Sequence, residues 1–292
     1  MINDVGFRNQ TNQTGTLLTT HRRLNTENVI HLKFVDDLTL AEAINLPTQL
    51  SRRPELFLPM QNSRVHSQLS DVSKYAEEND MRINYKKTKT ILFNPCKSMN
   101  FDVNFTINGH QLESVQEIRL LGVICRSDLR WSSNTRHIVN KANKRLWIIR
   151  RLKNLGTPVL NLVEVYVAQV RSLLELAVPV WHSSLTLDEK SDIERVQRSA
   201  CYIILGHNYE SYSKALELLS LEDLESRRVK LSLNFALKAE KSSKFKNWFI
   251  PNVKKTNTRY KNSKYCEVWA NHDRLTKSPI SHLINLLNNY YA

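Results

Sequence analysis

Residues 33–40 read KFVDDLTL, an apolar stretch with two adjacent acids, Asp36 and Asp37, at its centre. In an extended strand, successive side chains point to opposite faces, so neighbouring acids would not meet. The β-rich residues 29–35 (VIHLKFV) and the apolar residues 38–40 on either side instead predict a hairpin with both acids at its tip. There the carboxylates could share a hard cation, or they could only cap the turn.

The charge of the chain favours polyanionic partners. Its 292 residues include 42 Lys and Arg against 28 Asp and Glu, which gives a formal net charge of +14 and a pI near 9.7. Nucleic acid comes first among such partners and an acidic membrane surface second, while plain solubility is the alternative. No apolar run approaches the roughly 18 residues of a membrane span, and the N-terminus lacks the apolar core of a signal peptide. We therefore expect an intracellular protein, in nucleus or cytoplasm, that is neither secreted nor inserted in a membrane.

The cysteines do not indicate a metal site. They are far apart in the sequence, and neither a CxxC pair nor a histidine cluster at zinc-ligand spacing accompanies them: Cys96, Cys125, Cys201 and Cys266. We expect reduced, buried thiols.

The first part of the chain has a mixed pattern, and the length suggests about two domains. Residues 1–28 are polar and predict a poorly ordered leader. Residues 29–131 combine the hairpin with a helix over 63–79 and short strands over 81–93. Asn108-Gly109 adds a strong turn signal. This part is expected to be α+β.

The rest of the chain predicts helices. One apolar stripe before Gly156 is formed by Ile138, Ala142, Leu146 and Ile149. A second helix is expected to start at Thr157-Pro158 and to run towards Leu176.

Further helices are expected after residue 185. Thr186 and Glu189 form a capping box for a helix that ends at Gly206, and a helical stretch follows over 213–241. The helical region thus spans 132–245, and the basic tail 246–292 is expected to hold a short helix over 282–289.

Several motifs occur in the order known from one family. FVDD resembles the Y/F-x-D-D catalytic motif of reverse transcriptases, and KFVDDLTLAEAINL is similar to its form in non-LTR retrotransposons of the jockey type. INYKKTK (83–89) is similar to the N-x-x-K-T-K palm motif, and RLLGV (119–123) resembles the primer-grip hairpin. Segments from DLRWSSNTRHIV to ALELLSLEDLESRR resemble the thumb region, so the similarity covers about residues 29–245.

The resemblance implies a partial palm, followed by a helical thumb and extension, that catalyses RNA-directed DNA synthesis. Asp36 would be the principal ligand of Mg²⁺, or of Mn²⁺, and Asp37 an auxiliary one. Lys87 would act on the leaving pyrophosphate of a deoxynucleoside triphosphate, although a solvated lysine is an alternative and Lys86 or Lys89 could face the site instead. Leu121 and Gly122 would belong to the primer grip, where Gly122 permits a tight turn or is an ordinary bulge.

The resemblance also implies residues that this sequence lacks. In the family, an earlier palm carboxylate and a P-Q-G segment precede the D-D hairpin, and neither occurs here. MINDVG looks like the stretch just after that segment, so the chain is expected to begin inside the polymerase domain. Because two-metal catalysis needs the missing carboxylate, we expect little or no polymerase activity from the chain alone.

The helix before Gly156 is the candidate for binding a duplex of RNA template and DNA primer. It carries the cations Lys141, Lys144, Arg145, Arg150, Arg151 and Lys153, which could meet phosphates or only be solvated. A non-catalytic nucleic-acid-binding fragment is the rival function, and a protein-interaction module is a weaker third.

Other polar and aromatic residues are expected to be structural. Trp131, Trp147 and Trp181 are predicted to pack rather than to stack on bases. His182 has no evident partner, and Arg171 with Glu175 is expected to form an intrahelical pair.

Overall fold

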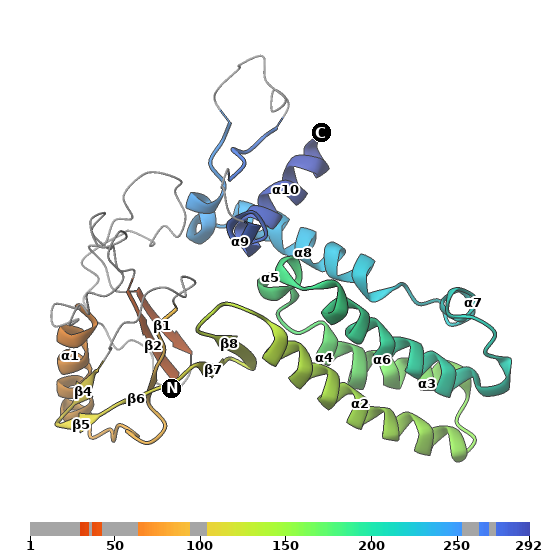
Figure 1. Ribbon diagram of the computed structural model, residues 1–292, viewed down its shortest axis with the longest axis horizontal. Helices are drawn as coiled ribbons and strands as arrows, with labels where there is room; N and C mark the ends of the chain where they lie inside the picture. The colour runs from red at the N-terminus through yellow and green to blue at the C-terminus, as the bar shows by residue number, and fades with distance from the viewer. Residues whose placement is uncertain (1–29, 35–36, 43–63, 94–103, 253–262, 269–272) are drawn as a thin grey trace. The chain divides into compact units, whose positions relative to one another are not determined.

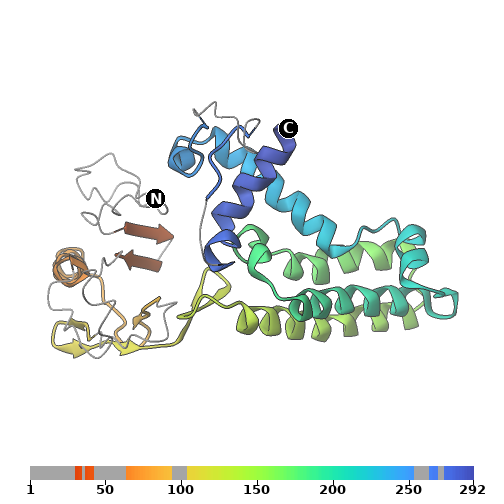
Figure 2. The same cartoon turned by 45° about the horizontal axis from the view of Figure 1, so that its top comes forward.

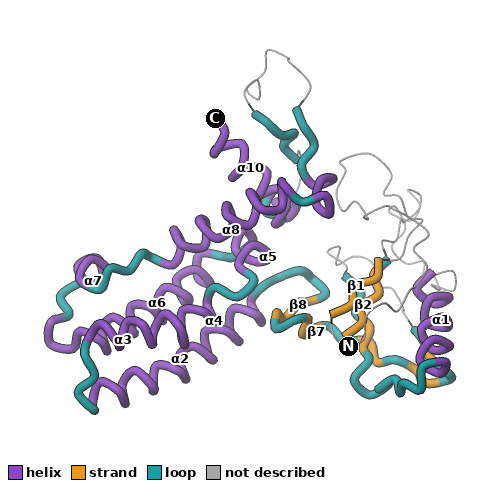
Figure 3. The backbone as a smooth tube through the Cα atoms, turned by 180° about the vertical axis from the view of Figure 1, so that it is seen from behind, coloured by secondary structure: helices purple, strands orange, loops and turns teal. Residues whose placement is uncertain are grey.

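The protein is a mixed α+β chain that divides into two compact units (Figure 1). The computed structural model describes residues 30–34, 37–42, 64–93, 104–252, 263–268 and 273–292. The first unit comprises Met1–Thr90, Ser98–Glu113 and Ala239–Pro251, and the second comprises Ile91–Lys97, Ser114–Lys238 and Asn252–Ala292. Strands are short, and most of the second unit is helical (Figure 3).

The hairpin predicted around the paired acids is confirmed in the backbone of the first unit. Strands β1 (Ile30–Phe34) and β2 (Asp37–Ala41) are antiparallel, and Phe34 lies opposite Asp37. Residues 35 and 36 lie outside the described residues, so the position of both acids at a hairpin tip stays a prediction.

Helix α1 (Arg64–Glu78) packs on a second hairpin in the first unit. This hairpin has β4 (Thr106–Ile107) and β5 (His110–Gln111) joined by Asn108-Gly109, as predicted. Both turn residues have positive φ, 49° and 78°, which Asn and Gly tolerate best. The apolar residues enclosed here form a small cluster of Leu69, Ile107 and Leu112.

The segment predicted as strands over 81–93 is mainly a turn. Its only strand is β3 (Lys89–Thr90), near β6 (Glu113–Ser114). The Asn84 side chain accepts a hydrogen bond from Lys87 N at 3.2 Å, and its carbonyl accepts from Thr88 Oγ1 at 2.9 Å. Local Asn bonds of this kind compete with a strand ladder.

The second unit begins with a hairpin and a long helix. Strands β7 (Glu117–Leu120) and β8 (Val123–Arg126) pair antiparallel, and helix α2 spans Ser132–Asn154. The predicted apolar stripe of α2 is buried, and Gly156 follows the helix with a φ of 79°. Ile124 N donates to Asn134 Oδ1 at 3.1 Å, which fixes the hairpin to the start of α2.

The next helix is interrupted by a wider turn. Helix α3 (Val159–Val165) continues into a π-helix, η2 (Tyr166–Arg171), and then into α4 (Ser172–Leu174). Ala177, with a φ of 52°, ends this run before α5 (Val178–Trp181) and the 3₁₀ turn η3 (His182–Ser184). The helix towards Leu176 is thus present but not uniform, and Pro158, rather than Thr157, is its N-cap residue.

Helix α6 (Leu187–Leu205) has the predicted capping box. Thr186 Oγ1 accepts from Glu189 N at 3.2 Å, and Glu189 Oε2 accepts from Thr186 N at 2.8 Å. Gly206, with a φ of 59°, ends the helix and opens η4 (Gly206–Asn208).

The prediction of one helical stretch over 213–241 was wrong. The chain forms α7 (Tyr212–Leu218) and α8 (Leu224–Lys241), and Ser220 between them has a φ of 50°. The side chain of Asp223 accepts from Ser226 N at 2.8 Å, which starts α8 anew. Short elements follow: η5 (Ser243–Trp248), α9 (Asp273–Thr276) and α10 (Pro279–Tyr291).

The core of the second unit lies between its helices. Helices α2 and α6 run along each other (Figure 2), and between the helices Tyr166, Val170 and Trp181 are fully buried. Helix α10 packs on α5 and η3. No helix among the described residues combines the length and apolar character needed to cross a bilayer.

Candidate nucleic-acid interface

The acid pair can be located only in part. Asp36 lies outside the described residues, and Asp37 is the first residue of β2, with its backbone described but not its side chain. Within the described part of the chain, no three His, Cys, Asp or Glu side chains form a group that could hold a metal. The predicted Mg²⁺ or Mn²⁺ site therefore stays a prediction based on the sequence.

Two of the three candidate lysines after α1 are solvent-exposed. Lys86 and Lys87 lie in the turn formed by residues 85–87. Lys89 instead forms an ion pair with Glu113. Of the three, Lys87 and Lys86 thus keep ammonium groups that could meet a phosphate.

The predicted primer-grip residues form the turn of the β7–β8 hairpin. Leu121 and Gly122 have φ values of 47° and 91°, and the Leu121 side chain is exposed. A Cβ on Gly122 would lie 3.4 Å from Leu176 Cδ2, so the turn packs closely on the residue that precedes Ala177. The strained, tightly held turn presents one apolar side chain to solvent.

An ion-pair group holds the base of this hairpin. Arg126 donates to Glu117 Oε1 across the strands at 2.8 Å and to both Asp128 oxygens at 3.0 and 3.1 Å. The bond from Arg126, followed by the other bonds and charges around it, lowers the pKa of Asp128. Ser133 Oγ of α2 donates to the same Glu117 oxygen at 2.5 Å, which ties the hairpin to the start of α2.

Helix α2 carries an outward stripe of cations. Its 23 residues include seven Lys or Arg and neither Asp nor Glu. Arg136, Lys144 and Arg151 are exposed and follow one another at intervals of about two helical turns, which is about 10 to 12 Å along the axis. Lys141 and Arg150 are exposed on the two flanks of this stripe. Such a row can contact the phosphates of a nucleic acid without reading bases.

Arg136 was not among the predicted residues. It precedes the run of cations that drew attention in the sequence, yet the helical period puts it on the face of Lys144 and Arg151. Extending the helix back to Ser132 would have revealed it.

Two predicted cations on α2 are already engaged within the protein. Arg145 donates to the carbonyl oxygen of Gln169 in η2 at 2.7 Å. Lys153 Nζ donates to the carbonyl oxygen of Ile203 at 2.5 Å, near the end of α6. A cation suits the C-terminal end of a helix, where carbonyl groups lack partners. Arg145 and Lys153 therefore connect α2 to other helices and do not belong to the outward stripe.

The tryptophan prediction was wrong at one position. Trp131 and Trp181 are buried, but Trp147 on α2 is 63% exposed and lies between Lys144 and Arg151. An exposed indole among cations is suited to stacking on an unpaired base.

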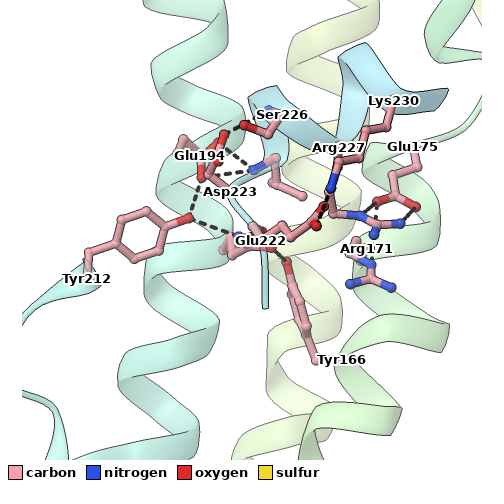
Figure 4. Close-up of polar contacts among 12 residues, drawn as sticks. Tyr166, Arg171, Glu175, Glu194, Tyr212, Glu222, Asp223, Ser226, Arg227 and Lys230 are labelled. Atoms are coloured by element: carbon pink, nitrogen blue, oxygen red, sulfur yellow. Dashed lines mark hydrogen bonds and ion pairs between the residues drawn. The ribbon is translucent and has the colours of Figure 1, made fainter. Parts of the chain in front are cut away.

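Polar residues join the helices of the second unit around Arg171 and Glu194 (Figure 4). Glu175 pairs with Arg171 at 3.4 Å, as predicted, and also with Arg227 Nε, which the sequence did not reveal. Tyr166 donates to Gln197 at 2.5 Å, and Gln197 Nε2 donates to the Glu222 carbonyl at 2.8 Å. These bonds orient α6 and the start of α8 within the second unit.

His182 has partners that the sequence did not reveal. Its Nδ1 accepts from Arg228 Nε at 3.3 Å, and its ring meets that of His282 on α10 edge to face at 5.5 Å. Burial, then the charge of Arg228 and then His282, lowers the pKa of His182 to about 4. Burial likewise lowers the pKa of His282. Both imidazoles are neutral at pH 7, and their role is to seat α10.

The described cysteines form no disulfide and lie in different surroundings. Cys201 is buried, Cys125 half-buried and Cys266 exposed, whereas Cys96 lies outside the described residues. Burial raises the pKa of Cys201 to about 11, so its thiol stays protonated and unreactive.

Comparison with protein-family models, curated proteins and solved structures finds no match for this chain. The function is therefore inferred from the motifs of the sequence and from the geometry of the described residues.

Proposed function

We propose that this chain is part of a reverse transcriptase, with a partial palm and a helical thumb. The reaction assigned to the family is Mg²⁺- or Mn²⁺-dependent transfer of a deoxynucleotide to a primer end on an RNA template. The main support is the order of the motifs: the acid hairpin, the INYKKTK turn and the RLLGV hairpin precede a basic helix.

The features of α2 support a duplex-binding role. Arg136, Lys144 and Arg151 form its outward stripe, and the helix has no acid to oppose phosphate binding. Counterion release from the duplex would drive this binding, so affinity should fall steeply with salt.

The chain tested alone is expected to bind a primer–template duplex without extending it. The sequence holds the acid pair but not the earlier palm carboxylate that the resemblance implies. Metal clamping of the reacting oxygens depends on that third acid. The rival function, a non-catalytic nucleic-acid-binding fragment, is favoured by the same basic helix.

The binding experiment uses fluorescence anisotropy of a labelled RNA–DNA duplex between 50 and 300 mM salt. We expect K144Q/R151Q to lower the slope of log affinity against log salt by about 2, because two phosphate contacts are lost. The matched control, R195Q/K214Q, removes the same charge from exposed ion pairs on α6 and α7. Equal slopes in the two variants would contradict the assignment of α2.

A primer-extension assay separates the proposed function from its rival. Purified chain, primer–template, deoxynucleoside triphosphates and Mg²⁺ or Mn²⁺ should give no template-dependent incorporation, and Asp36→Ala should leave binding intact. Incorporation that Asp36→Ala abolishes would overturn the expectation that the chain alone is inactive, and it would refute the rival as well. A longer polypeptide that supplies the missing acid strand should gain activity if the polymerase proposal is correct.

A further inference from the structure

Two adjoining hollows lie in the first unit, between α1, the segment after it and the β4–β5 turn. Their volumes are about 180 and about 240 Å³, and both are lined by Ser73, Glu77 and Asn108. Leu69 and Ile107 add apolar surface to one hollow, and Ala76 and Ile83 add it to the other. We call the pair the α1 pocket.

The backbone explains why three segments meet at this pocket. Asp80 has a φ of 53°, and Met81 N donates to the carbonyl oxygen of Ala76 at 2.8 Å, which turns the chain at the end of α1. Residues 81–83 and Tyr85 therefore line the same hollow as Glu77. On the other side, the positive-φ turn holds Asn108 against the helix.

The polar groups of the pocket offer mainly acceptors. Asn108 Nδ2 donates to Glu77 Oε1 at 3.2 Å and to the Tyr85 hydroxyl at 3.4 Å. Within the described residues, these contacts leave open the second oxygen of Glu77 and the amide oxygen of Asn108. Both can accept from a ligand that presents N–H groups side by side.

A buried hydroxyl in the pocket lacks a partner. Ser73 is 5% exposed, and its Oγ makes no hydrogen bond in the described part of the chain. A buried polar group without a partner has an energetic cost that a bound ligand can remove. Ser73 lines both hollows, and a rotation about its Cα–Cβ bond would turn the Oγ, now sealed from solvent, towards a molecule in either one.

The rim of the pocket selects against a cationic ligand. Lys74 lines one hollow and Arg82 the other, and both are exposed. Lys74 has only a loose pair with Glu78, at 3.9 Å. These two cations would repel an arginine or amine ligand, but they would attract a phosphate beside the pocket.

We propose that the α1 pocket binds a single unpaired guanine nucleotide. The Watson–Crick edge of guanine presents two adjacent N–H donors, which match the second oxygen of Glu77 and the amide oxygen of Asn108. The apolar residues contact the face of the base, and Lys74 and Arg82 meet its phosphate. Proteins read unpaired RNA bases through this edge, so the natural ligand class is single-stranded guanine-containing RNA. This site is separate from α2, which contacts a duplex in the proposed function.

The experiment titrates the full chain with GMP, IMP, AMP and CMP, followed by ¹H–¹⁵N NMR. We expect GMP to bind about tenfold more tightly than AMP or CMP, with IMP between them because it lacks the second donor. Glu77→Gln should weaken GMP binding about tenfold and remove the preference over AMP. Glu78→Gln is the matched control, since it makes the same charge change on the exposed neighbour paired with Lys74.

Two further variants test the other contacts. Ser73→Ala should weaken the binding of all four nucleotides, by a smaller factor than Glu77→Gln weakens GMP binding. Arg82→Gln should weaken the binding of the nucleotides but not of the nucleoside guanosine, since only the phosphate contact is lost. Unchanged spectra outside the pocket would show that the variants fold.

Several results would overturn the proposal. These are equal affinities for GMP and AMP, equal effects of Glu77→Gln and Glu78→Gln, or tighter binding of an arginine peptide than of GMP. Duplex binding measured on the same samples keeps the two proposals apart, because it depends on Lys144 and Arg151 in the other unit. Loss of guanine preference with intact duplex binding would refute only the pocket.

Discussion

The two units bury apolar surface in different ways. In the second unit, stripes on successive helices form one continuous cluster that extends from Val123 to Leu224. In the first unit, the described cluster of Leu69, Ile107 and Leu112 joins one helix to strands of two residues. A large core made of local helical stripes is robust, whereas a small core that depends on hairpin turns is sensitive to each turn.

The largest expected effect comes from truncating a core leucine in each unit. Leu146→Ala in α2 should lower the free energy of unfolding by about 3 kcal/mol, because a dense core cannot close over the cavity. Leu69→Ala should cost about 2 kcal/mol, since its small cluster can collapse more easily. Urea denaturation with hydrogen exchange read separately for each unit measures both. A greater loss for Leu69→Ala would reverse the comparison.

Acid should destabilise the second unit where His182 meets His282. The folded pKa of His182 is about 4, below its ordinary value of 6.5, so the unfolded chain binds more protons between these values. This contribution is fully present above pH 6.5 and is lost as the pH falls towards 4. We expect the free energy of unfolding to fall by about 2 kcal/mol, which would appear as faster amide hydrogen exchange in α5 and α10.

The control for the acid effect is His182→Asn, which offers an acceptor to Arg228 but does not titrate. This variant should flatten the pH dependence of the free energy of unfolding between pH 6.5 and 4. It should leave amide hydrogen exchange in α1 unchanged. An unchanged pH profile in this variant would assign the acid sensitivity to other groups.

Two lysines of α2 should differ in their effect on stability. Lys153→Met removes the bond to the Ile203 carbonyl oxygen and should lower stability by about 1.5 kcal/mol. Lys144→Met, on the exposed stripe, should change stability little while it weakens duplex binding. Thermal unfolding and anisotropy together separate the structural cation from the binding one, and equal shifts in Tm would remove the distinction.

The smallest effects are expected at the two hairpin turns. Gly109→Ala and Gly122→Ala each put a Cβ at positive φ, which should cost about 1 kcal/mol. The two variants should cost about the same, because the added Cβ makes only an ordinary contact with Leu176 at Gly122 and meets nothing within 4 Å at Gly109. Asn at either position should cost less than Ala, as chemical denaturation would show.

Local patterns were sufficient to predict much of the second unit. The buried stripe of α2 and the capping box of Thr186 and Glu189 both depend on residues three or four apart, and both are present. The break between α7 and α8 depends partly on Glu194, whose carboxylate accepts from Leu224 N at 3.2 Å. A contact so distant in sequence has no local signal.

The candidate site was predictable only in outline. Lys144 and Lys153 look alike in the sequence, and the difference arises because the end of α6 lies beside Lys153. The exposure of Trp147 follows from its place opposite the buried stripe, which the helical period could have shown. The assignment of Asp36 and Asp37 as metal ligands depends entirely on the sequence motif around them.

The π-helix η2 lets the second unit tolerate a change in chain length. Its hydrogen bonds reach one residue farther than those of an α-helix, so the stretch Tyr166–Arg171 accommodates one extra residue. Deleting exposed Ala168 would remove that extra residue and let the stretch wind as a regular helix, while the residues on either side keep their register. The same deletion in the regular helix α2 would rotate the following side chains by about 100°. The loss of one residue should therefore be better tolerated in η2 than in α2.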